Sequence, residues 1–290
     1  MNLSVLYRGP LTSCNYSCEY CPFAKRTETK AQLRRDQQSL VRFTRWIESQ
    51  RQHAWKVLLT PWGEALVRAW YRDAIVALTQ VRQLESVAVQ TNLSCGLDWI
   101  EDCRRNRLAL WATFHPTEAD AGVFRRKVRR LHNLGVRVCV GMVGVPEFLE
   151  AIMTMRRELP PEIYLWINAQ QPRARPYTPD ELKQFRAIDP HFELTLKRQP
   201  SRGLPCRTGK SVFCVDGRGD MRRCHFVHRV IGNIYDPTWE HCLHPRSCPN
   251  RFCDCFLGKA QLTADSLHEV FGENLLERLP LGFSTPRPSR

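Results

Sequence analysis

Short apolar segments alternate with helical segments along the first two thirds of the chain, and this alternation constrains the fold more than any other feature. Six runs have the length and apolar content of buried strands, namely Leu3–Tyr7, Trp55–Thr60, Ser86–Gln90, Leu108–Thr113, Arg137–Met142 and Tyr164–Ile167. Each run is followed by a segment with helical spacing: Ala31–Gln50, Ala65–Val81, Asp98–Arg107, Ala119–Leu134, Glu147–Leu159 and Pro179–Ile188. Because parallel strands need a crossover helix between them, six such units in series predict a parallel α/β sheet.

Two architectures satisfy this pattern over residues 1–195. The one that we favour is an open, partial (βα)6 TIM-like barrel, in which the strands curve around a common interior. A doubly wound sheet, with helices on both faces, fits the same periodicity. With 290 residues, of which 43% are hydrophobic, the chain is long enough to bury one large core or two smaller ones.

The composition and the periodicity of the sequence change after about residue 195. Glycine and proline become frequent, helical periodicity fades, and seven of the thirteen cysteines lie between Cys206 and Cys255. Residues 196–262 therefore form a cysteine-rich extension with too few apolar residues for a core of its own, and we expect a metal or cluster to supply its folding energy. Residues 263–290 are predicted to form a last helix, at about Thr263–Leu279, and a flexible tail.

The chain has neither an 18-residue apolar stretch nor an N-terminal basic segment followed by a long apolar run. We therefore expect a soluble cytoplasmic protein with no membrane segment. Because the cytoplasm keeps thiols reduced, thirteen cysteines indicate metal or iron–sulfur ligation rather than disulfides. Cys95, Cys103 and Cys139 lack ligand spacing and are predicted to be buried structural thiols.

Three cysteines follow the first predicted strand within eight residues, in the order Cys14, Cys18 and Cys21 (C-x3-C-x2-C). Loops that follow the strands form the functional rim of a barrel or of an α/β sheet. Three thiolates at this spacing can bind three irons of one cubane and leave the fourth iron open to a small molecule. A zinc site with three cysteines, completed by a ligand from elsewhere, is the alternative.

This loop, including Tyr20 before the last cysteine, resembles the signature of the radical S-adenosylmethionine (SAM) superfamily. The resemblance implies that Cys14, Cys18 and Cys21 bind a [4Fe-4S] cluster, and that SAM chelates the open iron through its amino and carboxylate groups. It further implies one-electron cleavage of SAM to methionine and a 5′-deoxyadenosyl radical, which abstracts a hydrogen atom from the substrate. An electron donor such as flavodoxin or ferredoxin is implied as a partner.

The second predicted strand end is similar to the same family. The segment from Thr60 to Glu64, TPWGE, resembles the family's Gly-Gly-Glu-Pro segment, although Trp62 and Ala65 depart from it. The resemblance implies that Gly63 lets the backbone approach the ligand and that the Glu64 carboxylate accepts hydrogen bonds from the SAM ammonium group. An alternative role for Glu64 is to stabilise the positive end of a helix dipole.

Three further strand ends complete the SAM site that the resemblance implies. Asn92 ends the third strand, and Thr113 places a hydroxyl at the end of the fourth. Gly144 lies in a segment partly similar to the family's adenine-binding G-x-I-x-G-x-x-E motif, for which ordinary strand-to-helix packing is the alternative. His115 is a further candidate, near the substrate, with a plain loop position as its alternative.

In the extension, Cys206 and Cys224 bracket Gly219 in a C-x12-G-x4-C pattern, inside a segment that reads as a β-hairpin over residues 211–224. A group of cysteines follows, with Cys248, Cys253 and Cys255 at its end. This order resembles the SPASM extension, or its shorter twitch form, of radical SAM enzymes, which holds auxiliary [4Fe-4S] clusters. The distal spacing, C-x5-C-x4-C-x-C, departs from the full SPASM pattern.

Seven thiols are too few for two fully ligated clusters, which need about eight, so we favour one auxiliary cluster. Cys206 and Cys224 are the first ligands that we assign to it, and the others come from Cys248, Cys253 and Cys255, ahead of Cys214 and Cys242. Tetrahedral zinc is the alternative occupant.

The net charge of +14, from 43 basic and 29 acidic residues, bears on the partner. One basic run, Phe124–Arg130, lies on a predicted helix, where a solvated outer face is the alternative to a binding surface. A second basic group lies in the extension: Arg202, Arg207, Lys210, Arg218, Arg222, Arg223 and Arg229. A positive field there would attract an acidic peptide or a nucleic acid, and no recognised nucleic-acid-binding module accompanies it. The resemblance to enzymes with this extension implies a peptide or protein substrate, with RNA or a small metabolite as the alternative. A non-enzymatic zinc or iron–sulfur protein is a third hypothesis.

Overall fold

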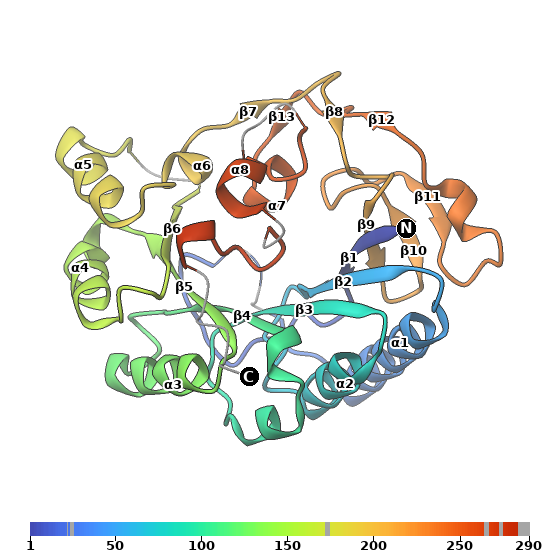
Figure 1. Ribbon diagram of the computed structural model, residues 1–290. Helices are drawn as coiled ribbons and strands as arrows, with labels where there is room; N and C mark the ends of the chain where they lie inside the picture. Colours follow the sequence, from blue (N-terminus) through green and yellow to red (C-terminus); the bar gives the residue numbers. More distant parts are fainter. Residues whose placement is uncertain (22, 24–25, 172–174, 264–266, 273–274, 284–290) are drawn as a thin grey trace.

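The structure, a computed structural model, is built on one open, curved sheet of nine strands (Figure 1). It describes residues 1–21, 23, 26–171, 175–263, 267–272 and 275–283. Six parallel strands lie side by side in chain order: β1 (Asn2–Arg8), β2 (Ala54–Leu59), β3 (Leu84–Thr91), β4 (Leu108–Thr113), β5 (Arg137–Gly144) and β6 (Leu165–Ala169). This order never reverses, as it would in a doubly wound sheet, so the predicted partial (βα)6 barrel is confirmed.

Helices lie around the outside of the curved sheet, as Figure 1 shows. They are α1 (Lys30–Ser49), α2 (Ala69–Gln80), α3 (Ala121–Asn133), α4 (Leu149–Glu158) and α5 (Pro179–Ile188). Three of them begin where a side-chain oxygen accepts a hydrogen bond from the first turn, at Thr29, Asp120 and Thr178. No helix in the described residues is long and apolar enough to cross a membrane.

Two predicted helices differ in the structure. α2 begins at Ala69 rather than Ala65, because the chain first makes a turn in which the Glu64 carboxylate accepts a hydrogen bond from Leu66 N–H (3.0 Å). The α-helix predicted over residues 98–107 is wrong: two short 3-10 helices, Asp98–Asp102 and Arg105–Arg107, occupy this region. Ile100 is the only buried residue of these two helices, so an α-helix there would lack an apolar face to stabilise it.

Side chains alternate along each strand between two hydrophobic cores. On β1, Leu3, Val5 and Tyr7 belong to the core between the sheet and the outer helices. Leu6 belongs instead to a second core inside the barrel. The curved sheet therefore needs apolar residues on both faces, which explains why its strands read as nearly continuous apolar runs.

The hairpin predicted in the extension joins the barrel sheet itself. β9 (Val212–Asp216) pairs in parallel with β1, and β10 (Asp220–Arg222) and β11 (Val230–Asn233) continue the sheet in antiparallel fashion. Two-residue ladders hold the rest of the extension, β7 (Gln199–Pro200) with β13 (Phe252–Cys253) and β8 (Pro205–Cys206) with β12 (Arg246–Ser247). The short helix α6 (Glu193–Leu196) leads into these ladders.

The C-terminal part of the described chain fills the interior of the barrel (Figure 1). α7 (Phe256–Lys259) and α8 (Leu267–Phe271) place apolar side chains there, and the Trp111 indole N–H of β4 donates to Leu276 O (2.9 Å). The single helix predicted over 263–279 is therefore wrong, since among the described residues of this segment only Leu267–Phe271 are α-helical and the chain turns at Gly272 (φ +51°). Of the predicted flexible tail, residues 284–290 lie outside the described residues.

Candidate cofactor site at the strand ends

A cavity of about 160 Å³ lies at the C-terminal ends of the first barrel strands. All three cysteines of the C-x3-C-x2-C loop line it, and none of them forms a disulfide. The other lining residues come from the same loop and from the ends of β2, β3 and β4: Tyr16, Ser17, Phe23, Pro61, Trp62, Gly63, Glu64, Gln90, Thr91, Asn92, Thr113 and His115. The structure thus brings four of the predicted SAM-site residues, Gly63, Glu64, Asn92 and Thr113, to one cavity with the cysteines.

Two carboxylates hold the start of the cysteine loop. Glu28 accepts hydrogen bonds from the backbone N–H groups of Thr12 (2.9 Å) and Ser13 (3.1 Å) and from both hydroxyls. Asp36 of α1 is buried and accepts a hydrogen bond from Leu11 N–H (3.2 Å). Burial raises the pKa of Asp36 to about 6, although its hydrogen-bond donors oppose this shift. The protein's own fold therefore fixes where the loop begins.

Gly63 packs directly on this loop. A Cβ atom at position 63 would stand 2.0 Å from Ser13 O, which is far too close for any side chain. The Gly63 N–H also donates to Leu11 O (3.2 Å). A glycine is thus required at position 63 because the backbone there packs against the cysteine loop. The resemblance to SAM-binding segments does not reveal this contact.

The Glu64 carboxylate is buried in the wall of the cavity. Its Oε1 accepts hydrogen bonds from Leu66 N–H (3.0 Å) and from the Thr91 hydroxyl (2.7 Å), and its Oε2 accepts one from Asn92 N–H (2.6 Å). Burial raises the pKa of Glu64, and the three hydrogen bonds oppose that shift. Because a carboxylate has about four acceptor sites, Glu64 keeps one for a donor inside the cavity.

The Asn92 side chain connects β3 to the cysteine loop. Its Nδ2 donates to Asn15 Oδ1 (3.0 Å) and lies 3.8 Å from Cys14 Sγ. Its Oδ1 accepts a hydrogen bond from Ser94 N–H (3.0 Å), which fixes the orientation of the amide. Asn92 therefore sets the position of Cys14 relative to the strand end, while its backbone N–H orients Glu64.

His115 contacts the cysteine loop from the end of β4. Its Nδ1 lies 2.9 Å from Tyr20 Oη and 3.2 Å from Cys18 Sγ, and the Tyr20 and His115 rings stack with centroids 5.9 Å apart. Burial lowers the pKa of His115 to about 4, so the imidazole is neutral near pH 7. Burial also raises the pKa of Cys18 to about 11. The structure places His115 where it positions a cysteine as well as lining the cavity.

Two predicted SAM contacts lie outside the lining of this cavity. Tyr20 contacts His115 and Phe148 instead, with ring centroids 5.9 and 5.7 Å away. Gly144, at the end of β5, packs against β6: a Cβ atom there would stand 3.0 Å from Ile167 Cγ2. Its carbonyl accepts a hydrogen bond from the Tyr177 hydroxyl (2.6 Å). Close packing thus accounts for this glycine without any ligand.

The sequence-based prediction missed an aromatic pair at the cavity. Trp62 is 40% exposed, and its ring lies 4.7 Å from that of Phe23, which is 51% exposed. The Arg8 guanidinium lies 4.0 Å from the Trp62 ring centroid and donates from Nε to Thr60 O (3.0 Å). The departure of Trp62 from the family's motif is the signal that could have indicated a special role.

Cys224 and Cys253 each lie within electrostatic range of three further cysteines of the extension, namely Cys206, Cys248 and Cys255. Burial raises the pKa of Cys224 to about 11 and that of Cys253 to about 12, and the neighbouring thiols raise both further. Cys206 lies on β8 and Cys253 on β13, so the two short ladders bring together thiols that are far apart in the sequence. All five predicted auxiliary ligands are thus neighbours.

The remaining cysteines differ in their surroundings. Cys214, on β9, is buried in the interior core but also lies within electrostatic range of Cys224 and Cys255, and Cys242 is half-buried. Of the three predicted structural thiols, Cys103 and Cys139 are buried and Cys95 is half-buried.

Neither cysteine group in the described residues forms a preformed site for a single ion. No three His, Cys, Asp or Glu side chains in this part of the chain are close enough to hold one metal ion. In a four-iron cluster each thiolate binds a different iron, so the ligands surround the cluster instead of meeting at one atom. The free thiols of Cys14, Cys18 and Cys21, which line the wall of one cavity, fit that requirement.

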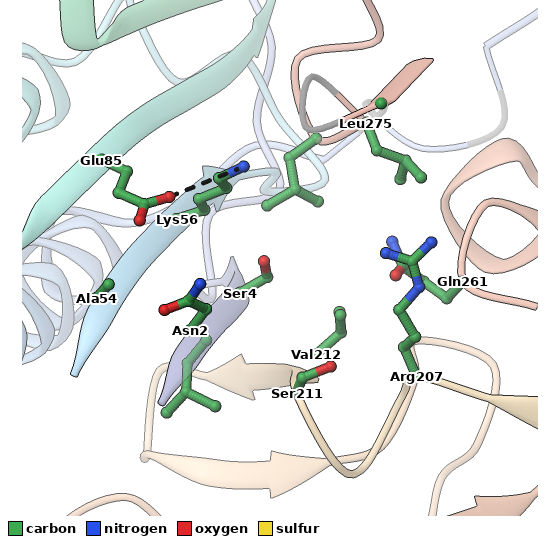
Figure 2. Close-up of a pocket in the computed structure, with 13 residues that line it drawn as sticks. Asn2, Ser4, Ala54, Lys56, Glu85, Arg207, Ser211, Val212, Gln261 and Leu275 are labelled. Atoms are coloured by element: carbon green, nitrogen blue, oxygen red, sulfur yellow. Dashed lines mark ion pairs between the residues drawn. The ribbon is translucent and has the colours of Figure 1, made fainter. Parts of the chain in front are cut away.

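A second cavity, of about 210 Å³, lies at the opposite ends of the strands (Figure 2). Asn2 and Ser4 line it from the start of β1, and Arg207 and Gln261 line it from the extension. Lys56 and Glu85 form an ion pair across its wall (3.8 Å). Because the cysteine loop follows the far end of β1, this cavity is no part of the cysteine site.

Part of the basic run on α3 holds the structure together. Lys127 Nζ donates to the carbonyls of Leu93, Ser94 and Cys95 (2.8–3.0 Å), and Arg125 pairs with Glu158 (2.6 Å). Lys127 and Arg125 thus have partners within the chain, whereas Arg126, Arg129 and Arg130 of the same run are exposed.

Comparison with known proteins identifies the fold. No protein-family model and no curated protein matches the sequence. Among solved structures, the chain is similar to native anSMEcpe with bound AdoMet, with 13% identity and a TM-score of 0.56 over 83% of this chain and 80% of that chain. It is likewise similar to native anSMEcpe with bound AdoMet and Kp18Cys peptide, with 12% identity and a TM-score of 0.55 over the same shares. At such identity the likeness shows a shared fold, a partial α/β barrel.

Proposed function

We propose that this chain is a radical SAM enzyme that modifies a peptide or protein. Cys14, Cys18 and Cys21 would hold a [4Fe-4S] cluster, and SAM would bind beside it in the cavity at the strand ends. When bound, the cluster and SAM supply a 5′-deoxyadenosyl radical that abstracts a hydrogen atom from the substrate. The observation that carries the proposal is that these three thiols line one cavity together with the buried carboxylate of Glu64.

The residues around the cavity have distinct roles in this proposal. The free acceptor site of Glu64 is suited to the ammonium group of SAM, and a charge-assisted hydrogen bond there orients the ligand. Asn92 and Thr113 offer further polar contacts in the same wall. His115 holds Cys18 in place through its Nδ1 (3.2 Å). Trp62, with Phe23 against it, shields the cavity from water.

We infer that an auxiliary [4Fe-4S] cluster binds in the extension, with four of the five neighbouring thiols as ligands. The electrostatic coupling of Cys224 to Cys206, Cys248 and Cys255 supports this arrangement. Arg8 lies within electrostatic range of Cys224 and Cys255 and would stabilise their thiolates. This region is the one that resembles a SPASM or twitch extension in sequence.

A peptide or protein is the substrate class that we favour. One of the similar structures, that of anSMEcpe, contains a bound Kp18Cys peptide as well as AdoMet, and it shares the fold of this chain. No recognised nucleic-acid-binding module accompanies the basic charge, so a peptide is favoured over nucleic acid. Reduction of the cluster calls for a donor such as flavodoxin or ferredoxin, and a reducing cytoplasm suits both clusters.

The experiment is anaerobic reconstitution followed by reaction with SAM and dithionite. Wild-type protein should contain about eight irons per chain, as two [4Fe-4S] clusters would supply, and should form 5′-deoxyadenosine. The triple variant Cys14→Ala, Cys18→Ala, Cys21→Ala should keep about four irons and form no 5′-deoxyadenosine. A triple variant that loses iron but still cleaves SAM, or a colourless wild-type protein that holds zinc, would refute the proposal.

A further inference from the structure

We propose that a cationic pocket beside the cofactor cavity is a carboxylate-binding subsite for an acidic peptide substrate. The pocket, of about 540 Å³, lies between the end of β1, α1 and the turn from β9 to β10. This inference rests on the proposed function, since it names the substrate class of the same site. The resemblance to radical SAM enzymes assigns no role to the arginines that line this pocket.

The pocket adjoins the cofactor cavity across one side chain. Trp62 lines both of them, with the Arg8 guanidinium 4.0 Å from its ring centroid. Cys214 and His225, beside the cysteine group of the extension, form another part of the pocket wall. A ligand in this pocket would therefore lie next to the SAM site and next to the extension, which is the place for a substrate.

The residues that line the pocket carry a net positive charge. Four arginines line it, namely Arg8, Arg35, Arg218 and Arg222, against the single carboxylate of Asp216. Asp216 accepts a hydrogen bond from Arg222 Nη1 (2.9 Å), and Arg218 pairs with Asp220 (3.0 Å). These pairs fix two guanidinium groups at the hairpin turn, where a carboxylate ligand would meet an ordered wall of donors.

The other two arginines retain donor capacity. Arg35 is exposed on α1 and has no hydrogen-bond or ion-pair partner among the described residues. Arg8 uses Nε for Thr60 O, and its two terminal nitrogens have no hydrogen-bond partner in the described part of the chain. The buried Nε2 of His225 likewise lacks a partner there. Unused donors on several sides of one pocket are suited to a carboxylate, which has about four acceptor sites.

The turn is held tightly against the barrel, so the pocket has a fixed shape. A Cβ atom at Gly217 would stand 2.6 Å from Pro10 Cδ and 3.1 Å from Ser39 Oγ. A preorganised pocket favours binding because little side-chain or backbone freedom is lost when the ligand enters. The geometry thus supports recognition of a carboxylate, and an acidic peptide is the ligand that offers several in series.

The test measures binding of short fluorescent peptides to the full reconstituted protein by anisotropy. A deca-glutamate blocked at both ends should bind, and a blocked deca-glutamine should not. Arg35→Gln should weaken deca-glutamate binding about tenfold, the effect expected for one charge-assisted hydrogen bond. The matched control is Arg34→Gln, an exposed neighbour on α1 that does not line the pocket, and it should stay within about twofold.

Further arms identify the source of the carboxylate. If deca-glutamine with a free C-terminus binds and the binding depends on Arg35, the pocket recognises a terminal carboxylate. If only blocked deca-glutamate binds in this way, the pocket recognises side-chain carboxylates. Equal effects of the Arg34 and Arg35 substitutions would overturn the subsite, as would tight binding of the blocked deca-glutamine. A ten-nucleotide RNA that binds more tightly than deca-glutamate, with the same dependence on Arg35, would overturn the peptide assignment.

The binding test is independent of SAM chemistry. A wild-type protein that fails to cleave SAM, yet binds deca-glutamate through Arg35, would refute the proposed function and leave the subsite standing. A protein that cleaves SAM but does not distinguish deca-glutamate from deca-glutamine would refute the subsite alone.

Discussion

The loop that carries Cys14, Cys18 and Cys21 and the extension that carries Cys206 to Cys255 differ in what supports them. The loop is fixed by Glu28 and Asp36 and packs on Gly63 at the end of β2. The distal part of the extension is held by two ladders of two residues each. The apolar residues at its end, such as Phe256 and Leu262, are buried, and Phe256 belongs to the barrel interior.

The two regions are therefore expected to depend on a bound cluster to different degrees. The loop is part of a folded barrel, so we expect it to present its thiols in the absence of any ligand. The extension lacks a core of its own, so we expect much of its stability to come from ligation.

The largest expected effect concerns the extension. Cys206→Ala together with Cys224→Ala should remove about four irons and unfold the distal ladders, because ligand binding there is also folding energy. Trypsin should then cleave within residues 196–262, while the barrel resists. The control is Cys95→Ala with Cys242→Ala, which should keep all of the iron. An extension that stays protease-resistant without its iron would show that protein contacts alone support it.

Gly63→Ala should disrupt the loop with the barrel otherwise intact. The added methyl group would stand 2.0 Å from Ser13 O. Because Ser13 O is a backbone atom, it cannot move aside by a change of rotamer as the end of a side chain could. We expect the free energy of unfolding to fall by about 1–3 kcal/mol. We also expect the protein to lose the cluster bound by Cys14, Cys18 and Cys21. Gly96→Ala, whose Cβ would have no neighbour closer than 4.0 Å, should change stability by about 0.5 kcal/mol or less. Normal iron content in Gly63→Ala would contradict the packing argument.

Glu64→Gln should weaken SAM binding by about 10- to 150-fold, the equivalent of a charge-assisted hydrogen bond of about 1.5–3 kcal/mol. The substitution keeps the shape but not the hydrogen bonds, since its amide N–H2 must face the N–H of either Leu66 or Asn92. Isothermal titration with SAM and urea unfolding should therefore be measured together.

Thr91→Val separates the two effects of Glu64→Gln. It removes one donor to Glu64 but leaves the charge, so it should lower stability by about 1 kcal/mol and weaken SAM binding much less. If Thr91→Val weakened SAM binding as much as Glu64→Gln, the charge of Glu64 would not be the source of affinity.

The smallest effect is a pH dependence caused by Asp36. Its pKa is raised to about 6 in the folded protein, so its protonated form is favoured there and stability is lost as the pH rises through that value. Between pH 5 and 7.5 this residue should remove about 1 kcal/mol of unfolding free energy. Asp36→Asn should flatten this part of the stability profile, as measured by urea unfolding. An unchanged slope would show that Asp36 is ionised across the whole range.

The barrel could be predicted because its pattern is local. Each strand is a short apolar run, and parallel pairing requires a helix between neighbours. The α-helices predicted at residues 98–107 and 263–279 failed for tertiary reasons. The first has too little apolar surface to bury, and the second is shaped by the interior that it fills.

The part of the cavity lined by residues at strand ends could be predicted, because the C-terminal ends of parallel strands meet at one edge of the sheet. Glu64, Asn92 and Thr113 each follow or end a strand, so they lie together. Phe23 comes from the cysteine loop, whose course no periodicity encodes. Gly144 shows the opposite case, a motif-like glycine that the packing of β6 explains.

The C-terminal segment that fills the barrel interior, called the plug below, has a consequence for biosynthesis. Leu276, whose carbonyl accepts the hydrogen bond from Trp111, is translated 255 residues after Cys21. At roughly 5–20 residues per second, a ribosome needs on the order of 10 to 50 s to cover that distance. The last of the six parallel strands, β6, ends at Ala169, which is 107 residues before Leu276, so all six strands are translated on the order of 5 to 20 s before the plug that fills their interior. Maturation of the N-terminal cysteine site and closure of the barrel are thus separated in time, and the nascent chain exposes the apolar inner face of its sheet to chaperones until the last turn arrives.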